Sequence, residues 1–192
     1  MDFSTILINC TAPTLCGIKP SCLFSLDADN YNKNYNLILK LKKDLNSLNK
    51  KLIIINKKPN LYLVFVYDSL LLFTYLNSYV NLLYLISKGY VINKNKEYLI
   101  AQLLSRLKNS KEFPHEVGIF LGYPLKDVVN FEKDKGKTSL YSGLWQVYDN
   151  TEQAILLMQR YKTCTRLCLD QLNKGISIPN IIEGFNLMEA NK

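Results

Sequence analysis

Residues 52–67 read LIIINKKPNLYLVFVY, and this stretch decides the fold class of the chain. Its two ends, Leu52–Asn56 and Leu61–Tyr67, are rich in β-branched and aromatic residues, which favour buried strands. The residues between them, Lys57–Asn60, include the proline and asparagine that are typical of a turn. Because this connection is short, the two segments are predicted to pair as an antiparallel hairpin.

Helices are predicted on both sides of this hairpin along the chain. Apolar residues recur at helical spacing in Asn34–Asn49 and in Glu97–Lys108, so each segment has one face suited to packing. Periodicity and boundary residues also predict helices at Ser4–Asn9, Ser78–Lys88, Pro114–Leu121, Leu125–Phe131 and Thr151–Lys174, with a short one after Pro179. Strands are further predicted at Ser21–Leu26 and Gly143–Tyr148.

The order of these elements predicts an α+β fold. Strands and helices do not alternate in regular strand–helix–strand units, which argues against a doubly wound parallel sheet. We therefore expect a small, mostly antiparallel sheet covered by helices, with a long helix near the C-terminus. The length of 192 residues and the hydrophobic content of 48% suit a single domain over residues 1–192.

The positive charge of the chain has two interpretations. The formal net charge of +8 is spread along the sequence as single lysines and pairs, without a basic block. It can attract an anionic partner such as nucleic acid or an acidic protein. It can also reflect a lysine- and asparagine-rich composition over a solvated surface, and the dispersion of the charge favours this interpretation.

The cysteines and the apolar segments indicate a cytoplasmic protein. Five cysteines, an odd number, follow an N-terminus without a basic region or a long apolar run, so free thiols are expected. The most apolar stretch, Leu61–Ile86, is interrupted by Asp68 and by two asparagines. It contains no uninterrupted run of the roughly 18–20 residues that a membrane-spanning helix needs, so a strand followed by a helix is predicted.

The segment Phe113–Gly118 contains the only histidine of the chain, His115. With Pro114 at the first helical position, His115 and Glu116 are expected in the first turn of a helix. The helix dipole disfavours a protonated imidazole there, so a neutral side chain is expected that can act as a base, a hydrogen-bond donor or a metal or haem ligand. Alternatively, Glu116 favours the helix start and His115 caps a neighbouring backbone group.

The sequence excludes several known metal and cofactor motifs. A single histidine rules out a His-Glu-x-x-His zinc site, and no glycine-rich nucleotide motif or nucleophile elbow occurs. Cys10, Cys16 and Cys22 lack the spacing of a zinc or iron–sulfur motif. Cys164 and Cys168 face the same way on one helix and can help to hold a metal, but small buried thiols are the commoner explanation. No metal site and no cofactor is therefore predicted from a motif.

Two further segments suggest binding. Cys10–Pro20 contains two prolines and a glycine and is predicted to lack regular structure. Its Thr14 and Lys19 can bind an anion together with backbone amides, although a rigid surface connector is slightly favoured. Residues 117–129 have the helix–glycine–helix order of a helix-turn-helix, but the second helix is expected to expose one lysine beside two acids, among them Asp127, so nucleic-acid binding is weakly supported.

Residues 113–124, FPHEVGIFLGYP, and residues 12–19, APTLCGIK, together with Gly143, Trp145 and Tyr148, carry a family resemblance. The chain resembles, over nearly its whole length, a family of unknown function from anaerobic bacteria with a Pro-His-Glu signature. Cys16 departs from that pattern, in which a small alanine-like residue is expected, so no special role for Cys16 is implied. The resemblance suggests association with flavodoxin-like and iron-uptake functions.

The resemblance implies a site, because the shared segments are expected to converge on one pocket. His115 would act as base or ligand with Glu116 as its orienter, both in catalytic positions. Thr14 and Lys19 would contact a small anionic or carbonyl-bearing ligand, with Trp145 and Tyr148 as an aromatic wall. Haem, flavin or iron are the cofactors considered, in a small-ligand-binding protein or accessory enzyme of anaerobic iron or redox metabolism. The alternative is a non-catalytic module whose basic surface contacts nucleic acid or an acidic, flavodoxin-like protein.

Overall fold

The computed structural model describes residues 2–92 and 95–190, and for residues 186–190 only the backbone. The chain forms two compact units. The first comprises Met1–Leu71 and Arg160–Lys192, and the second comprises Leu72–Gln159. The predicted α+β class is confirmed, with a small antiparallel sheet and a long helix near the C-terminus.

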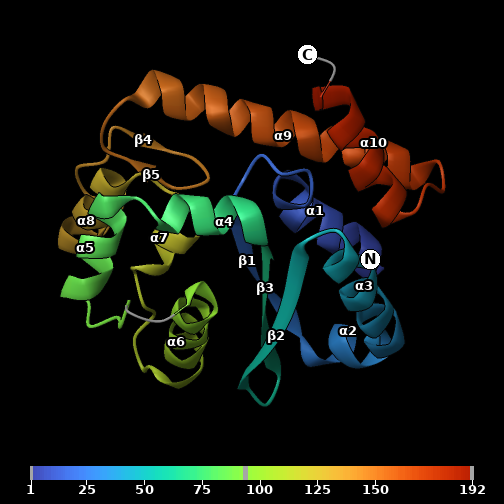
Figure 1. The fold of residues 1–192 in the computed structure, drawn as a ribbon, viewed down its shortest axis with the longest axis horizontal. Helices are drawn as coiled ribbons and strands as arrows, with labels where there is room; N and C mark the ends of the chain where they lie inside the picture. The colour runs from blue at the N-terminus through green and yellow to red at the C-terminus, as the bar shows by residue number, and fades with distance from the viewer. Residues whose placement is uncertain (1, 93–94, 191–192) are drawn as a thin grey trace. The chain divides into compact units, whose positions relative to one another are not determined.

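The sheet belongs to the first unit and has the strand order β1-β3-β2 (Figure 1). Its strands are β1 (Ser21–Asp27), β2 (Lys50–Lys58) and β3 (Leu61–Asp68), and both pairings are antiparallel. Leu52 of β2 and Cys22 of β1 both stand opposite Val66 of β3. The hairpin predicted from residues 52–67 is therefore confirmed, with a register shift between Asn56 and Lys58 that the sequence did not indicate.

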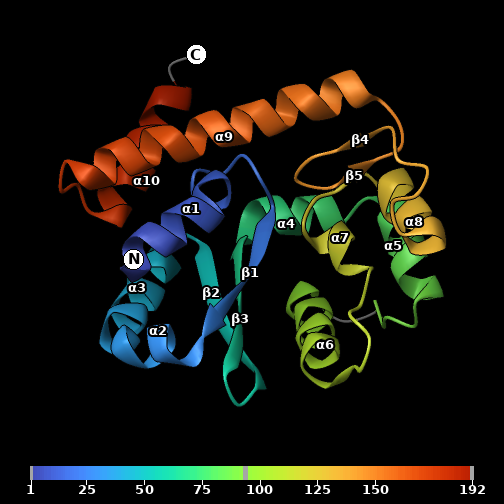
Figure 2. The same cartoon turned by 180° about the vertical axis from the view of Figure 1, so that it is seen from behind.

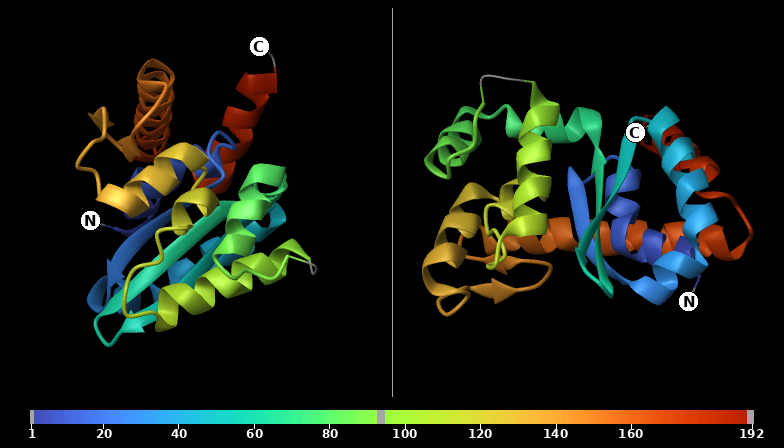
Figure 3. Two further views of the ribbon diagram at one scale, coloured as in Figure 1. Left: turned by 90° about the vertical axis from the view of Figure 1, so that its left-hand side faces the viewer. Right: turned by 90° about the horizontal axis from the view of Figure 1, so that it is seen from below.

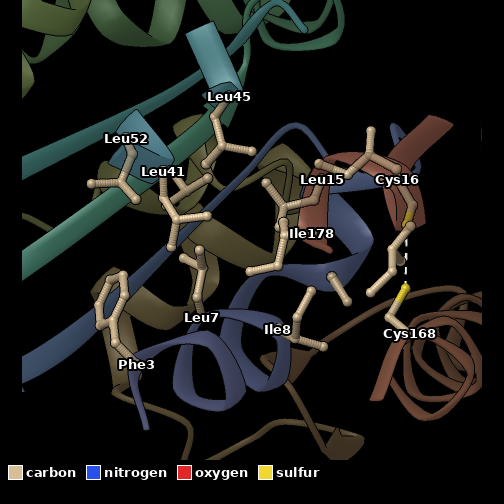
Figure 4. Packing of buried hydrophobic residues seen from close by; sticks show 14 of the residues in the cluster. Phe3, Leu7, Ile8, Leu15, Cys16, Leu41, Leu45, Leu52, Cys168 and Ile178 are labelled. Carbon is tan, nitrogen blue, oxygen red and sulfur yellow. Dashed lines mark hydrogen bonds between the residues drawn. The ribbon is translucent and has the colours of Figure 1, made fainter. Parts of the chain in front are cut away.

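Helices of the first unit cover one face of this sheet. α1 (Phe3–Leu15) packs against β1 and β3, and α3 (Tyr35–Ser47) packs against β2 (Figure 2). The remaining helices are α2 (Ala28–Lys33), α10 (Ile178–Ala190) and the part of α9 (Thr151–Asn173) that begins at Arg160. Figure 4 shows side chains from these elements converging on one core, among them Phe3, Leu7, Leu45, Leu52 and Ile178. Side chains of β3 alternate between the two faces of the sheet, so Val64 and Val66 lie on the same face and both contribute to this core.

The first helix is longer than predicted, because Pro13 lies inside it. The prediction of irregular structure over Cys10–Pro20 is wrong for Cys10–Leu15, which are helical, and correct for residues 16–20. Because Pro13 lies in the last turn, its missing N–H removes only one hydrogen bond of the helix. The helix then ends in a glycine motif. Gly17 has a φ of +70°, its N–H donates to Thr14, and the N–H of Ile18 donates to the carbonyl of Pro13. This pattern is a Schellman motif, which satisfies the final carbonyls and turns the chain into β1.

The second unit contains the helices α5 (Tyr79–Ser87), α6 (Lys96–Asn109), α7 (Val117–Phe120) and α8 (Leu125–Asp134). Its hairpin consists of β4 (Tyr141–Ser142) and β5 (Gln146–Val147), and Figure 3 shows it beside α8. The predicted strand Gly143–Tyr148 is therefore only partly correct, because residues 143–145 form the turn of this hairpin.

Two further differences from the predictions have local causes. The helix predicted at Pro114–Leu121 begins only at Val117, because Pro114–Val117 forms a separate turn closed by the N–H of Val117. α2 was not predicted, although Asp27 caps it by accepting from the N–H of Asn30 at 2.8 Å.

Among the described helices, none alone has the length and apolar character to cross a membrane. α4 (Ser69–Leu76) and α5 meet the criterion only when taken together, and they are bent by 77° relative to each other.

Candidate functional site

A cavity of about 420 Å³ in the second unit is the candidate site. Its volume lies within the range of about 300–1,000 Å³ that is usual for small-molecule sites. Residues before α7, both short helices α7 and α8, and the turn of the β4–β5 hairpin line it. Aromatic side chains dominate the lining: Phe113, Tyr123, Phe131 and Trp145. Among the described residues that line the cavity, none is a lysine or an arginine.

His115 lines this cavity with an available imidazole. It lies in the turn before α7, and its carbonyl accepts from the N–H of Gly118 at 3.1 Å. Its ring stands edge-on to Phe131 of α8, with 5.4 Å between ring centroids and an interplanar angle of 75°. Within residues 2–92 and 95–190, neither ring nitrogen has a hydrogen-bond partner. The imidazole is therefore positioned by packing, and its polar atoms are free for a ligand.

Glu116 has a different set of contacts. Its carboxylate is buried, pairs with Arg106 of α6 at 3.0 Å and accepts from the hydroxyl of Tyr90 at 3.3 Å. Arg106 also lies 4.0 Å from the centre of the Tyr90 ring. Burial, followed by the negative charge of Glu116, raises the pKa of Tyr90. These contacts fasten the turn that carries His115 to α6, whereas the sequence predicted that Glu116 would orient the imidazole itself.

Trp145 is held in the cavity wall by Asp127 of α8. The buried carboxylate of Asp127 accepts from the indole N–H of Trp145 at 2.8 Å and from the backbone N–H of Tyr148 at 2.8 Å. Trp145 also stacks on Tyr123, with 5.0 Å between centroids and an angle of 21°. Asp127 was expected to be exposed on a recognition helix, and this expectation is wrong, because only 2% of the residue is exposed. No signal in the sequence pairs it with a tryptophan 18 positions away.

Tyr148 closes a loop next to the cavity and is not among the described residues that line it. Its hydroxyl donates to Asp134 at 2.5 Å and accepts from the N–H of Gly136 at 3.0 Å. Burial, together with the hydrogen bond to Asp134, raises the pKa of Tyr148 to about 12. Hydrogen bonds from Thr138 and from Tyr148 lower the pKa of Asp134. Trp145 of the predicted aromatic wall lines the cavity together with Tyr123, and a contribution of Tyr148 to ligand binding stays a prediction.

Thr14 and Lys19 belong to the first unit and are both buried. The hydroxyl of Thr14 lies 3.1 Å from the sulfur of Cys22, and the ammonium group of Lys19 lies 3.6 Å from the same sulfur. His115 and Trp145, two of the residues expected to converge on a ligand, both line one cavity of the second unit. A contribution of Thr14 and Lys19 to the same site remains a prediction.

Three cysteines of the first unit form a second cluster of chemically active groups. The sulfurs of Cys16, Cys164 and Cys168 all lie within 4.8 Å of one another, and those of Cys16 and Cys168 point toward each other at 3.5 Å (Figure 4). Hydrogen bonds from Cys16 and then from Cys164 lower the pKa of Cys168. The sequence placed Cys164 and Cys168 on one helix face but gave no reason to expect Cys16 beside them. Such a group of thiols can hold a metal ion.

Comparison with known proteins places the chain in a family of unknown function. The family described as protein of unknown function (DUF3793) matches residues 7–182, nearly the whole chain. No curated protein and no solved structure matches the chain.

Proposed function

The chain belongs to the DUF3793 family, and from the geometry of its cavity we propose that the second unit binds a small, flat, mostly apolar molecule. A carbonyl or similar group of this molecule would form a hydrogen bond with His115. The observation that carries the proposal is a cavity with an aromatic wall and one imidazole whose nitrogens have no partner among the described residues.

The lining supports a flat ligand. The stacked pair of Trp145 and Tyr123 offers a planar surface, and Phe131 meets the edge of His115. Aromatic faces bind planar ring systems by stacking and by burial of apolar area. Asp127 cannot move toward a ligand without releasing the indole N–H, so the wall is formed before the ligand arrives.

The lining also supports an uncharged ligand. The sequence left open an anionic or a carbonyl-bearing molecule, but the described lining has no cation to balance an anion. The buried carboxylate of Asp127 further disfavours negative charge at this wall. A conjugated ring with carbonyl groups, such as the ring system of a flavin or a quinone, has the required shape and acceptors. Flavin is one of the cofactors considered from the sequence.

The wider role follows only from the resemblance. A redox-active ring would suit a small-ligand-binding protein or accessory enzyme of anaerobic iron or redox metabolism in the cytoplasm, with a flavodoxin-like protein as partner. The alternative, a non-catalytic module on nucleic acid, keeps only weak support. Asp127 of the second helix is buried against Trp145 and would not face phosphates. An exposed lysine of that helix, Lys126, is already paired with Asp149 at 2.7 Å.

The experiment uses Trp145, the only tryptophan of the chain, as its reporter. The full-length protein is titrated with riboflavin and with menadione while tryptophan emission is followed, and calorimetry gives independent affinities. We expect saturable quenching with at least one ring system. His115→Ala should weaken binding about 5-fold, since a hydrogen bond contributes about 1 kcal/mol and 1.4 kcal/mol is a factor of ten. His115→Gln, which keeps a donor, should recover part of that loss.

Lys133→Ala is the matched control, because Lys133 is exposed on the helix that supplies Phe131. It should leave the affinities unchanged. Haemin serves as a third probe. If haemin shows a Soret shift with the wild-type protein and none with His115→Ala, the imidazole is an axial ligand instead of a hydrogen-bond donor. The absence of saturable binding by all three probes, or equal binding by wild type and His115→Ala, would overturn the proposal.

A further inference from the structure

We propose that Cys16, Cys164 and Cys168 form a three-thiolate site for Cu(I) in the first unit. The three sulfurs lie within 4.8 Å of one another, and two of them are 3.5 Å apart. This site is independent of the ligand cavity proposed above, because all its residues belong to the other unit.

The spacing of the sulfurs matches a trigonal metal site. Bonds of about 2.3 Å from a central ion to three sulfurs in one plane place the sulfurs roughly 4.0 Å apart. The observed separations, from 3.5 Å up to at most 4.8 Å, bracket this value. Shifts of about half an ångström, within the reach of ordinary side-chain adjustment, would bring all three sulfurs to bonding distance.

The number of ligands selects the ion. Among the residues that the structure describes, no histidine, aspartate, glutamate or further cysteine joins the three sulfurs. Structural zinc requires four ligands in a tetrahedron, so this set is one short for zinc. Cu(I) is a soft ion that prefers thiolates and is satisfied by three of them.

The fold holds the three thiols rigidly. Cys16 caps the C-terminus of α1 directly before the Schellman turn at Gly17, and its N–H donates to Ala12 at 2.9 Å. Cys164 and Cys168 lie one turn apart on α9 and therefore share a face. All three residues are at least 96% buried, which limits the exposure of a bound ion to bulk water.

A neighbouring cavity of about 520 Å³ gives access to the sulfurs. Cys164, Cys168 and Arg160 line it together with Gln171 and Asn180. Binding converts three thiols and one Cu(I) into a complex with a net charge of −2 and releases three protons. Arg160, one turn before Cys164, lines the same cavity, and its positive charge would favour the negatively charged complex.

A disulfide between Cys16 and Cys168 is the competing use of the same atoms. Their separation of 3.5 Å is short enough to close with a small movement. That bond would consume an oxidant and two of the three sulfurs, and it would leave Cys164 without a function. The convergence of all three sulfurs is accounted for by an ion and not by a disulfide.

The test is an anaerobic titration of the reduced full-length chain with Cu(I) in competition with bathocuproine disulfonate. We expect one Cu(I) per chain, seen by native mass spectrometry, and thiolate-to-copper absorption in the near ultraviolet. Cys16→Ala, Cys164→Ala and Cys168→Ala should each weaken binding about 100-fold or more, since even indirect partners of a metal contribute 10–100-fold. Cys10→Ala and Cys22→Ala are matched controls and should bind like wild type, because neither sulfur belongs to the cluster.

X-ray absorption on the wild-type complex keeps the test decisive if a variant fails to fold. Three sulfur neighbours at about 2.3 Å support the proposal, whereas two sulfurs or nitrogen ligands overturn it. The proposal would also be overturned if bound Co²⁺ gave a tetrahedral spectrum that was abolished by adding Zn²⁺ but not by adding Cu(I). The same holds if copper fails to bind while diamide links Cys16 to Cys168, or if a control variant loses the ion.

Discussion

Replacing Asp127 should destabilise the second unit more than any neighbouring substitution on α8. Its carboxylate accepts two hydrogen bonds at 2.8 Å, one from the Trp145 indole and one from the Tyr148 backbone, and it is 2% exposed. A hydrogen bond to a charged group contributes about 1.5–3 kcal/mol, and a buried donor left without a partner costs a similar amount. Asp127→Ala removes both acceptors, so we expect a loss of about 3–5 kcal/mol.

Asp127→Asn should cost less. The asparagine oxygen can still accept from one donor, but its amino group would face the other, so a loss of about 2–3 kcal/mol is expected. Urea denaturation followed by the emission of Trp145 measures both values directly, because this residue is the only tryptophan. The shift of its emission in the native state reports whether the indole has turned toward solvent.

Lys126→Ala is the control for this prediction. Lys126 is the adjacent residue, but its ion pair with Asp149 is solvent-exposed, with side-chain exposures of 63% and 45%. Such pairs contribute about 0–1 kcal/mol, so this substitution should be nearly neutral. If Asp127→Asn unfolds within about 0.5 kcal/mol of wild type, the hydrogen bonds of Asp127 do not hold the cavity wall.

Three further predictions concern other parts of the chain. Gly118→Ala should lower the free energy of unfolding by about 1–3 kcal/mol, measured by thermal or urea denaturation, because the new Cβ would lie 2.7 Å from Val128. Gly184→Ala is the control and should be neutral or stabilising, because its Cβ would meet nothing within 4 Å. Asp134 has a lowered pKa, so its stabilisation of the 134–138 loop is present above about pH 4 and lost as the pH falls further. The protection factor of the Gly136 amide, which corrects for the intrinsic exchange rate at each pH, should therefore fall on acidification, and Asp134→Asn should show low protection at every pH. In native conditions a thiol reagent should modify Cys10 first, because it is partly exposed while the other four cysteines are buried; early modification of Cys168 would contradict the burial of the cluster.

The elements that sequence reasoning predicted well are those with strong local patterns. The hairpin of β2 and β3 followed from β-branched runs on both sides of a turn, and α6 followed from its apolar spacing. Both patterns reflect packing against one surface, which periodicity records directly. α1 was predicted too short, because the effect of Pro13 depends on its place in the last turn and on the glycine motif that follows.

The site was predictable only in part. His115 stood out as a lone histidine after a proline, and it does line a cavity with Trp145. Asp127 did not stand out, because its importance comes from a hairpin turn that brings the indole to α8. The thiol cluster depends on a contact between residues 152 positions apart, which no local pattern records.

The register shift at the end of β2 bears on whether the edge of the sheet can pair with another chain. β2 is an edge strand of the sheet, and its run Leu52–Ile55 would readily template pairing with another chain. Lys51 precedes this run, Lys57 and Lys58 follow it, and the irregularity between Asn56 and Lys58 interrupts the regular edge. Flanking charges and a bulge are the features by which natural sheets resist edge-to-edge aggregation. Lys57 and Lys58, at the end of the edge strand, therefore stand where natural sheets place gatekeepers against self-association, and they carry part of the +8 charge.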